Sequence, residues 1–175
     1  MTNQTLDCSD LDNYLGKPIQ PARLHEPLSS LDIKRWVQAM HYPNRLHYDR
    51  DFAAQSRFGG LTAPVSFPVA CDDGHGVAPA CVGYIPESHL IFGGDEWWFS
   101  DKRIRPGDTL TNERVPLDYS IKETSFAGPT CFQRGDNSFY NQDGDLISRQ
   151  RSTSIRYRAD LAREKGAFPL CDADK

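Results

Sequence analysis

Residues 33–67 read IKRWVQAMHYPNRLHYDRDFAAQSRFGGLTAPVSF, and this stretch decides the fold that we expect. An amphipathic segment comes first and ends in a polar segment that runs from His41 to Asp49. Two histidines, two tyrosines and an aspartate lie within these nine residues, and histidine, tyrosine and aspartate side chains can all transfer protons. The stretch therefore combines helix-forming patterns with a candidate catalytic site.

The amphipathic segment predicts a helix over residues 30–41. Ser29 or Ser30 offers an N-cap, and apolar residues recur at the three- and four-residue spacing of a helix face. We expect Trp36 and Val37 to face the core. A proline two residues after the helix ends it.

Two further helical pieces are expected in the same stretch. Asp49 begins a short second helix, which Gly59-Gly60 closes. Pro64 suits the first turn of a third, buried helix that begins near Ala63, although Pro68 limits its regularity. The loop of residues 72–83 that follows has few packing residues.

The second half of the chain predicts a meander of antiparallel strands over residues 89–99, 109–121, 129–140 and 145–157. The first strand contains a glycine bulge, and Asn141-Gln-Asp-Gly144 is a hairpin turn. One apolar helix, the one near Ala63, is available to cover such a sheet. We therefore predict an α+β protein in which a long antiparallel sheet wraps around a central helix, the hot dog arrangement.

Length and charge restrict the class of protein further. The 175 residues suggest one domain over 1–175, with a core at about 15–157 and tails at 1–14 and 159–175. A net charge of −4 argues against broad nucleic-acid binding.

The N-terminus lacks the pattern of a secretory signal, and no apolar run approaches the ~20 residues that span a bilayer. Five widely spaced cysteines then indicate reduced thiols, so we expect a cytoplasmic protein that does not bind membranes.

Three motifs in order resemble the MaoC-like hot dog proteins, which include the R-specific enoyl-CoA hydratases, and in particular their fungal-fatty-acid-synthase-like dehydratase branch. The first is Asn44-Arg-Leu-His47-Tyr-Asp49 followed by an alanine. The second is Phe58-Gly-Gly-Leu-Thr-Ala-Pro64, similar to the segment that enters the central helix. The third is Arg105-Pro-Gly-Asp-Thr109, followed by the hairpin turn. The resemblance covers about residues 15 to 157.

The resemblance implies an enzyme that hydrates a 2-enoyl thioester or dehydrates a 3-hydroxyacyl thioester, carried by CoA or an acyl carrier protein. His47 falls on the family's catalytic histidine and Asn44 on its asparagine. Val65 falls near the residue whose N–H polarises the thioester carbonyl at the start of the central helix, where free N–H groups favour an oxyanion. Gly60 and Ala63 lie in the same segment and are expected to bind substrate.

The family's second catalytic residue, an aspartate five residues before the histidine, is Tyr42 in this chain. Tyr42 could donate a proton, bind the water or form a wall of the pocket. Asp49 could orient His47 or cap the next helix. His41 could replace the missing carboxylate or simply end the first helix.

A metal site is a further reading of Cys71, Asp72, Asp73, His75 and Cys81. Their spacing lacks the tight ligand pairs of zinc sites, so we expect no metal and no cofactor.

Two functions remain open from the sequence. The first is a hydro-lyase with His47 as acid and base, or a divergent isomerase or cyclase acting on a related substrate. The second is a partner or substrate-binding subunit of a hetero-oligomer, because one of the two catalytic residues is missing. A hot dog sheet of this size leaves an edge or face exposed, so we expect a dimer, either a homodimer or part of a hetero-oligomer.

Overall fold

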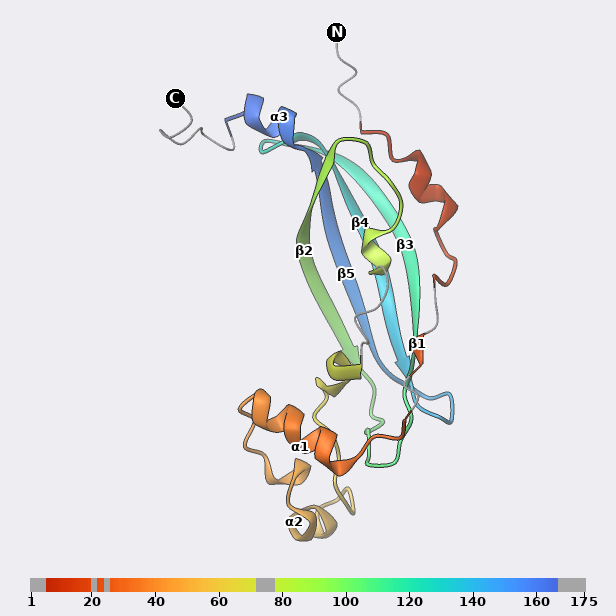
Figure 1. Ribbon diagram of the computed structural model, residues 1–175, viewed down its shortest axis with the longest axis vertical. Helices are drawn as coiled ribbons and strands as arrows, with labels where there is room; N and C mark the ends of the chain where they lie inside the picture. The colour runs from red at the N-terminus through yellow and green to blue at the C-terminus, as the bar shows by residue number, and fades with distance from the viewer. Residues whose placement is uncertain (1–5, 20–21, 24–25, 72–77, 167–175) are drawn as a thin grey trace.

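The computed structural model describes residues 6–19, 22–23, 26–71 and 78–166. Its centre is an antiparallel sheet with strand order β1-β3-β4-β5-β2 (Figure 1). The strands are β1 (Ala22–Arg23), β2 (Ser88–Phe99), β3 (Thr111–Thr124), β4 (Gly128–Tyr140) and β5 (Leu146–Arg158). The four long strands and the α+β class expected from the sequence are confirmed.

The glycine bulge lies in β2, as expected. The pairing of β2 with β5 shifts register between Phe92 and Gly94, which leaves Gly93 as the extra residue. A Cβ atom on Gly93 would lie 2.9 Å from the carbonyl oxygen of Thr153, so a larger residue would push against the β5 backbone. The bulge therefore bends β2 at a point where only glycine allows the two strands to approach.

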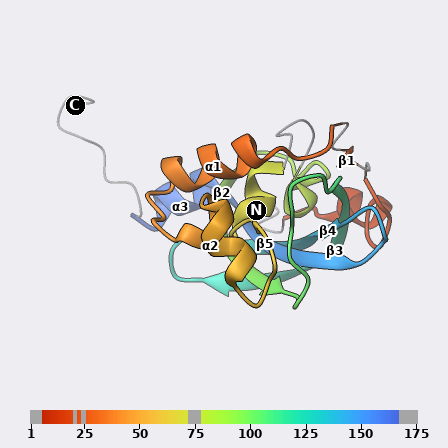
Figure 2. The ribbon, with the colours of Figure 1, turned by 90° about the horizontal axis from the view of Figure 1, so that it is seen from below.

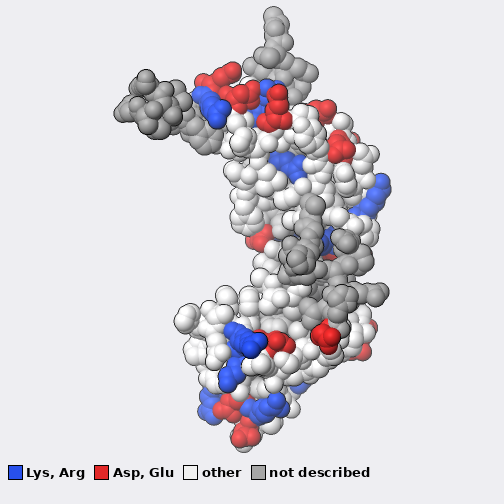
Figure 3. Space-filling model, viewed as in Figure 1, with Lys and Arg blue, Asp and Glu red and all other residues white. Residues whose placement is uncertain are grey.

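Two α-helices form a lobe at one end of the sheet (Figures 1 and 2). Helix α1 (Ser30–Ala39) begins with a reciprocal capping box between Ser29 and Asp32 and confirms the first expected helix. Helix α2 (Arg50–Gln55) follows the 3-10 helix η2 (Arg45–His47). We call residues 28–66 the helical lobe. A recess separates the lobe from the rest of the molecule in Figure 3.

The expected buried helix near Ala63 takes a different form. In the described residues this central segment contains two 3-10 helices, η3 (Phe67–Cys71) and η4 (Pro79–Cys81), and residues 72–77 lie outside the description. Pro79 opens η4, and Ala78 before it is extended with ψ at 139°, as the ring of the following proline favours, so an α-helix does not continue through this point. The expectation of a regular helix is therefore corrected for the described residues.

Side chains of the concave face of the sheet hold the segment around η4 in place. Ser154 Oγ donates to the carbonyl of Ala80, and Gln133 Nε2 donates to the carbonyl of Val82 at 3.2 Å. Arg156 donates to the carbonyls of Val82 at 3.0 Å and Gly83 at 2.8 Å. These donors satisfy carbonyls that a short 3-10 turn leaves unpaired.

Apolar cores occupy the two ends of the sheet. Near the lobe, a cluster joins α1, η3 and the sheet through Leu28, Ile33, Val37, Ala63, Phe67, Cys71, Ile104, Leu110 and Ile147. Trp36 packs on it and meets Phe67 edge to face. At the other end, Leu6, Cys8 and Leu11 are buried against Ile85 and Cys131. Two terminal pieces also pack on the sheet. The first is the N-terminal segment with 3-10 helix η1 (Ser9–Asn13). The second is the C-terminal helix α3 (Ala159–Glu164), which buries Leu161 and Ala162. No helix in the described part of the chain is long and apolar enough to cross a membrane.

Gly135 is the point where η4 touches the sheet, and it gives a stability test. A Cβ atom there would lie 2.3 Å from the carbonyl carbon of Pro79, a contact with backbone that cannot relax easily. We expect Gly135→Ala to lower the free energy of unfolding by about 3 kcal/mol, as overpacking does. Urea denaturation measures it. In the control Gly60→Ala the new atom meets only the end of the Arg105 side chain at 3.6 Å. Equal losses in both variants would contradict the close packing at Gly135.

Candidate active site

The loop that carries His47 is fixed by its own caps. Asn44 Oδ1 accepts the N–H of Leu46 at 3.0 Å and begins η2. Asp49 then caps α2 by accepting the N–H of Phe52 at 3.0 Å. His47 lies between these caps and is buried, with 5% of its surface exposed. The two polar neighbours of the motif thus shape the backbone that places the imidazole.

A hydrogen bond to the backbone fixes the imidazole ring. His47 Nδ1 lies 2.6 Å from the carbonyl oxygen of Thr62. A carbonyl oxygen only accepts, so Nδ1 carries the proton and Nε2 of the neutral ring carries the lone pair. Nε2 has no hydrogen-bond partner among the described residues. The arrangement holds a neutral imidazole whose Nε2 lone pair is not used by another described residue.

Tyr42 is the nearest aromatic neighbour of this imidazole. The two rings stack with centroids 5.5 Å apart and planes inclined by 28°. Tyr42 is itself 48% exposed and lines an open groove of about 460 Å³ together with Lys34, Val37, Gln38, His41, Pro43 and Tyr48. Tyr42 therefore stands between the buried His47 and a groove large enough for part of a ligand.

Burial changes the acidity of His47. Desolvation lowers its pKa below the ordinary value of 6.5, and the hydrogen bond to the Thr62 carbonyl opposes that effect only in part. The neutral ring is therefore the form present at neutral pH. A neutral histidine is a base, whereas a carboxylate partner would have favoured the charged form.

Asp49 does not contact His47. Its carboxylate accepts the Phe52 N–H and pairs with Arg45, with Arg45 Nη2 2.6 Å from Asp49 Oδ2. The Phe52 N–H and then the Arg45 guanidinium lower the Asp49 pKa. Of the two roles that the sequence left open, the cap is confirmed. No carboxylate in the described part of the chain forms an ion pair or hydrogen bond with His47.

The segment from Gly60 to Val65 follows the histidine loop. The Ala63 N–H donates to the carbonyl of Ile104 at 2.8 Å, so it is already occupied. The Val65 N–H has no acceptor among the described residues. Ala63, Pro64 and Val65 line a small pocket of about 10 Å³ with Phe99 and Ile147. Of the Ala63 and Val65 N–H groups, that of Val65 is the one without an acceptor among the described residues.

The sequence did not single out two parts of this site. Thr62 acts through its backbone carbonyl, which leaves no pattern in the side chains. Lys34 and Gln38 line the groove beside Tyr42 and Tyr48, although nothing in their types distinguishes them from ordinary surface residues. The available signal in the sequence was the spacing of Lys34, Gln38 and His41 by four and three residues, which places them on one face of the predicted helix.

The described residues hold no group of three or more His, Cys, Asp and Glu side chains that could bind a metal ion. Asp72, Asp73 and His75 lie outside the described residues, so the metal reading of that loop is not tested. Burial raises the pKa of the Cys71 thiol to about 12, which opposes the thiolate form that binds metals.

Comparisons with known proteins identify the fold. The MaoC-like dehydratase from Rhodospirillum rubrum has 23% sequence identity over 85% of this chain and 95% of that chain, with a TM-score of 0.63. The unliganded R-hydratase PhaJ1 from Pseudomonas aeruginosa has 20% identity over 79% and 81%, with a TM-score of 0.57. The ChsH1–ChsH2 complex from Mycobacterium tuberculosis has 16% identity over 81% and 84%, with a TM-score of 0.64. The chain thus has the hot dog fold.

The family follows from the sequence comparison. The family described as the FAS1-like dehydratase domain region matches residues 14–150, and the chain belongs to this family. The resemblance that the three motifs indicated is confirmed. No curated protein sequence matches the chain.

The lowered pKa of His47 gives a prediction about pH. A proton NMR titration of the His47 imidazole should show a midpoint below 6.5. Tyr42→Ala should raise that midpoint because it exposes the ring to water. Tyr48→Ala, which removes a groove tyrosine that does not stack on His47, should leave it unchanged.

The same shift makes stability depend on pH. The unfolded chain takes up the proton near pH 6.5 and the folded chain resists it, so the free energy of unfolding falls as pH drops below 6.5. A midpoint at or above 6.5 in the folded protein would contradict both statements.

Proposed function

We propose that the protein is a hydro-lyase that adds water to a 2-enoyl thioester or removes it from a 3-hydroxyacyl thioester. The observation that carries the proposal is the neutral, buried His47, whose Nδ1 proton is held by the Thr62 carbonyl and whose Nε2 has no hydrogen-bond partner among the described residues. Membership of the FAS1-like dehydratase family supports the class of reaction. We infer a cytoplasmic location from the cysteine pattern of the sequence.

In the proposed hydration His47 handles both protons. Nε2 takes a proton from water as the water oxygen bonds to the β-carbon, and the π electrons of the alkene move toward the thioester carbonyl. The imidazolium then returns a proton to the α-carbon, which restores the carbonyl and the neutral ring. Dehydration is the reverse. The depressed pKa suits this role, because the ring is neutral when it must act as a base.

The other candidate residues have supporting roles in this proposal. The Val65 N–H stabilises the enolate oxygen, since it has no acceptor among the described residues. Tyr42 shields one face of the imidazole and offers its hydroxyl to the water. Gly60 and Ala63 shape the backbone beside the thioester, and Asn44 keeps η2 in place.

Substitution of His47 tests the proposal. We expect His47→Gln to lower kcat for hydration of crotonyl-CoA by at least about 100-fold, because loss of a general acid–base has that size. The measurement follows the loss of enoyl-thioester absorbance. Asp49→Asn keeps an N-cap side chain and should retain activity, since Asp49 does not touch His47.

Two results would contradict this assignment. Equal activity in the natural chain and in folded His47→Gln would remove His47 from the reaction. A large loss in Asp49→Asn without a loss of stability would give Asp49 a catalytic part. Circular dichroism checks that both variants fold.

A second function is favoured by one observation, the lack of a carboxylate on His47 among the described residues. In this alternative the chain is a partner or substrate-binding subunit, and another hot dog chain supplies the complete catalytic pair. Its similarity to the ChsH1–ChsH2 complex is consistent with such an assembly. Purified protein that leaves crotonyl-CoA and longer enoyl-CoAs unchanged, yet gains hydratase activity with a co-expressed hot dog chain, would favour it.

We also propose that the chain forms a dimer through β2. β2 pairs only with β5 in the described part of the chain, so its other edge is open. It exposes the apolar side chains Leu90, Ile91, Phe92, Trp98 and Phe99.

Light scattering of size-separated protein tests this interface. We expect the natural chain to be a dimer and Phe92→Asp, at a residue 72% exposed, to be a monomer. Tyr84→Asp, at a residue 70% exposed outside β2, is the matched control and should remain dimeric. A natural chain that is monomeric at micromolar concentration would refute the proposal.

A further inference from the structure

Two thiols meet at the end of the sheet that lies away from the helical lobe. Cys8 precedes η1, and Cys131 lies on β4. Both belong to one buried cluster, in which Cys8 is 4% exposed and Cys131 is 0% exposed. The two thiols are hydrogen-bonded to each other, and both cysteines are free. We call Cys8 and Cys131 the thiol pair.

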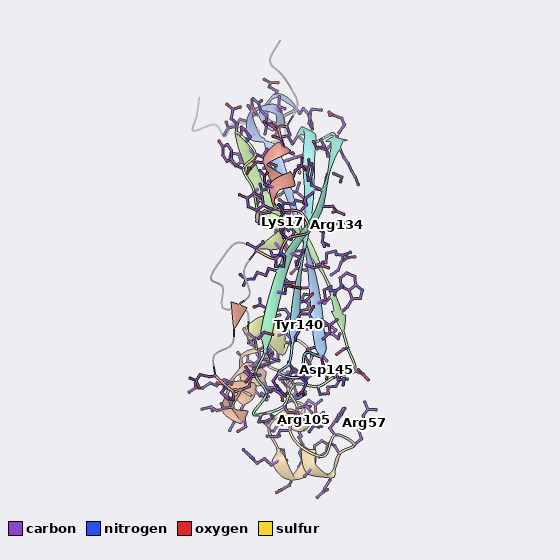
Figure 4. All side chains as sticks on the ribbon, turned by 90° about the vertical axis from the view of Figure 1, so that its right-hand side faces the viewer. Lys17, Arg57, Arg105, Arg134, Tyr140 and Asp145 are labelled. Carbon is purple, nitrogen blue, oxygen red and sulfur yellow. The ribbon has the colours of Figure 1, made fainter. Side chains whose placement is uncertain are left out.

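The thiol pair joins two parts of the chain that are far apart in the sequence. We call residues 6–19 the N-terminal strap, and Figure 1 shows it in red along the end of the sheet opposite the lobe. In Figure 4 the labelled Lys17, near the end of the strap, lies toward the middle of the molecule, with Arg57 and Arg105 far below it at the lobe. The pair is thus remote from the proposed active site.

Noncovalent contacts hold the strap over the thiol on the sheet. Asp10 Oδ2 accepts the N–H of Tyr84 at 2.8 Å, and Asp12 Oδ1 accepts the hydroxyl of Tyr119 at 3.0 Å. Both acceptors lie in η1, within four residues of Cys8. The reduced chain therefore keeps the two thiols together without a covalent bond between the strap and the sheet.

A buried guanidinium adjoins the thiol pair. Arg156 on β5 is the strand partner of Cys131, and its Nη atoms donate to the carbonyls of Val82 and Gly83. Its Nε is buried without a hydrogen-bond partner among the described residues. A neighbouring positive charge stabilises a thiolate. Arg156 therefore gives this apolar cluster a group that favours the reactive form of a cysteine.

The two thiols differ in acidity. The hydrogen bond with Cys131 lowers the pKa of the Cys8 thiol, and the Arg156 charge lowers it further, whereas burial opposes both effects. The same hydrogen bond, together with burial, raises the pKa of the Cys131 thiol. Cys8 is thus the better nucleophile, and Cys131 is placed to react with an oxidised Cys8.

We propose that the thiol pair is a redox site, at which hydrogen peroxide oxidises Cys8 and Cys131 to a disulfide that ties the N-terminal strap to β4. The two sulfur atoms already lie in contact, so the bond forms with little movement of the chain. Peroxide is the oxidant of choice because it is small enough to reach a covered pair. The inference does not depend on the proposed hydro-lyase reaction.

The oxidation balances in two steps. The Cys8 thiolate attacks one peroxide oxygen, an S–O bond forms as the O–O bond breaks, and the hydroxide that leaves takes up the thiol proton to give water. The Cys131 sulfur then attacks the sulfur of the Cys8 sulfenic acid. An S–S bond forms, the S–O bond breaks, and the hydroxide leaves with the Cys131 proton as a second water. Two thiols lose two electrons, and peroxide gains them.

Alkylation and peptide mapping of the natural chain test the site directly. The folded protein is treated with hydrogen peroxide, catalase removes the excess, and N-ethylmaleimide then labels the free thiols in urea. We expect the number of labelled cysteines in the intact mass to fall from five to three. Tryptic digestion should recover one crosslinked peptide that joins Cys8 to Cys131, and dithiothreitol should release it.

Single variants test the order of attack. In Cys131→Ala the sulfenic acid of Cys8 has no resolving thiol, so dimedone should trap it there after peroxide treatment. In Cys8→Ala, Cys131 should give no dimedone adduct, because its pKa is raised. Cys81→Ala, the matched control, removes another free cysteine and should still form the disulfide.

Urea denaturation shows what the bond does to the strap. A crosslink between residues 8 and 131 removes conformations from the unfolded chain, so oxidation should raise the urea midpoint of the natural chain by about 1 M. Dithiothreitol should reverse this shift. Peroxide should leave the midpoint of Cys8→Ala unchanged.

Three results would overturn the inference. Five labelled cysteines in the folded, peroxide-treated natural chain would mean that no disulfide forms. A crosslinked peptide that joins a different pair would move the site elsewhere. A dimedone adduct on Cys131 in Cys8→Ala would reverse the roles of the two thiols. The map of the natural chain decides the pairing even where a variant fails to fold.

Discussion

The peptide groups of Thr62 and Ala63 connect the helical lobe to the sheet. The Thr62 N–H donates to the carbonyl of Leu46 at 3.5 Å, and the Thr62 carbonyl accepts the proton of His47 Nδ1 at 2.6 Å. The Ala63 N–H donates to the carbonyl of Ile104 at 2.8 Å, just before β3. Two adjoining residues therefore fix the histidine loop on one side and the loop that carries Arg103 and Arg105 on the other. The tautomer of His47 and the position of the loop between β2 and β3 depend on the same short backbone segment.

Tyr42 and the aspartate of the resembled motif act on an imidazole in opposite ways. A carboxylate beside a histidine stabilises the imidazolium and raises its pKa. The Tyr42 ring covers His47 without a compensating charge, and desolvation lowers the His47 pKa. In the proposed reaction, the first proton transfer is favoured because the ring is a neutral base. The second is favoured because the imidazolium that results is a stronger acid than an ordinary histidine. One side chain can then serve both steps.

Local signals in the sequence predicted local structure well. The serine cap and apolar spacing gave α1, Asp49 marked the start of α2, and alternation with turn residues gave β2 to β5. The motifs also indicated the family and led to His47. The central segment was harder to predict, because Pro68 and Pro79 favour short turns whose course depends on the sheet beneath. The Thr62 carbonyl and the hydrogen bond from Arg105 to the Phe58 carbonyl could not be predicted, since one acts through the backbone and the other joins residues 47 positions apart in the chain.

The hydrogen bonds that hold η4 to the sheet run from side chains of β4 and β5 to main-chain carbonyls. Gln133, Ser154 and Arg156 recognise the path of the backbone at residues 80–83 and not the side chains that it carries. Packing limits identity on both sides of this contact: Gly135 must stay small, and a Cβ on Gly83, whose φ is +76°, would lie 2.9 Å from Leu11. Substitutions in this covering segment therefore keep the hydrogen bonds to the sheet, so relatives of this protein could vary the wall above the sheet wherever the new side chains still fit the buried space at Ala80 and Val82.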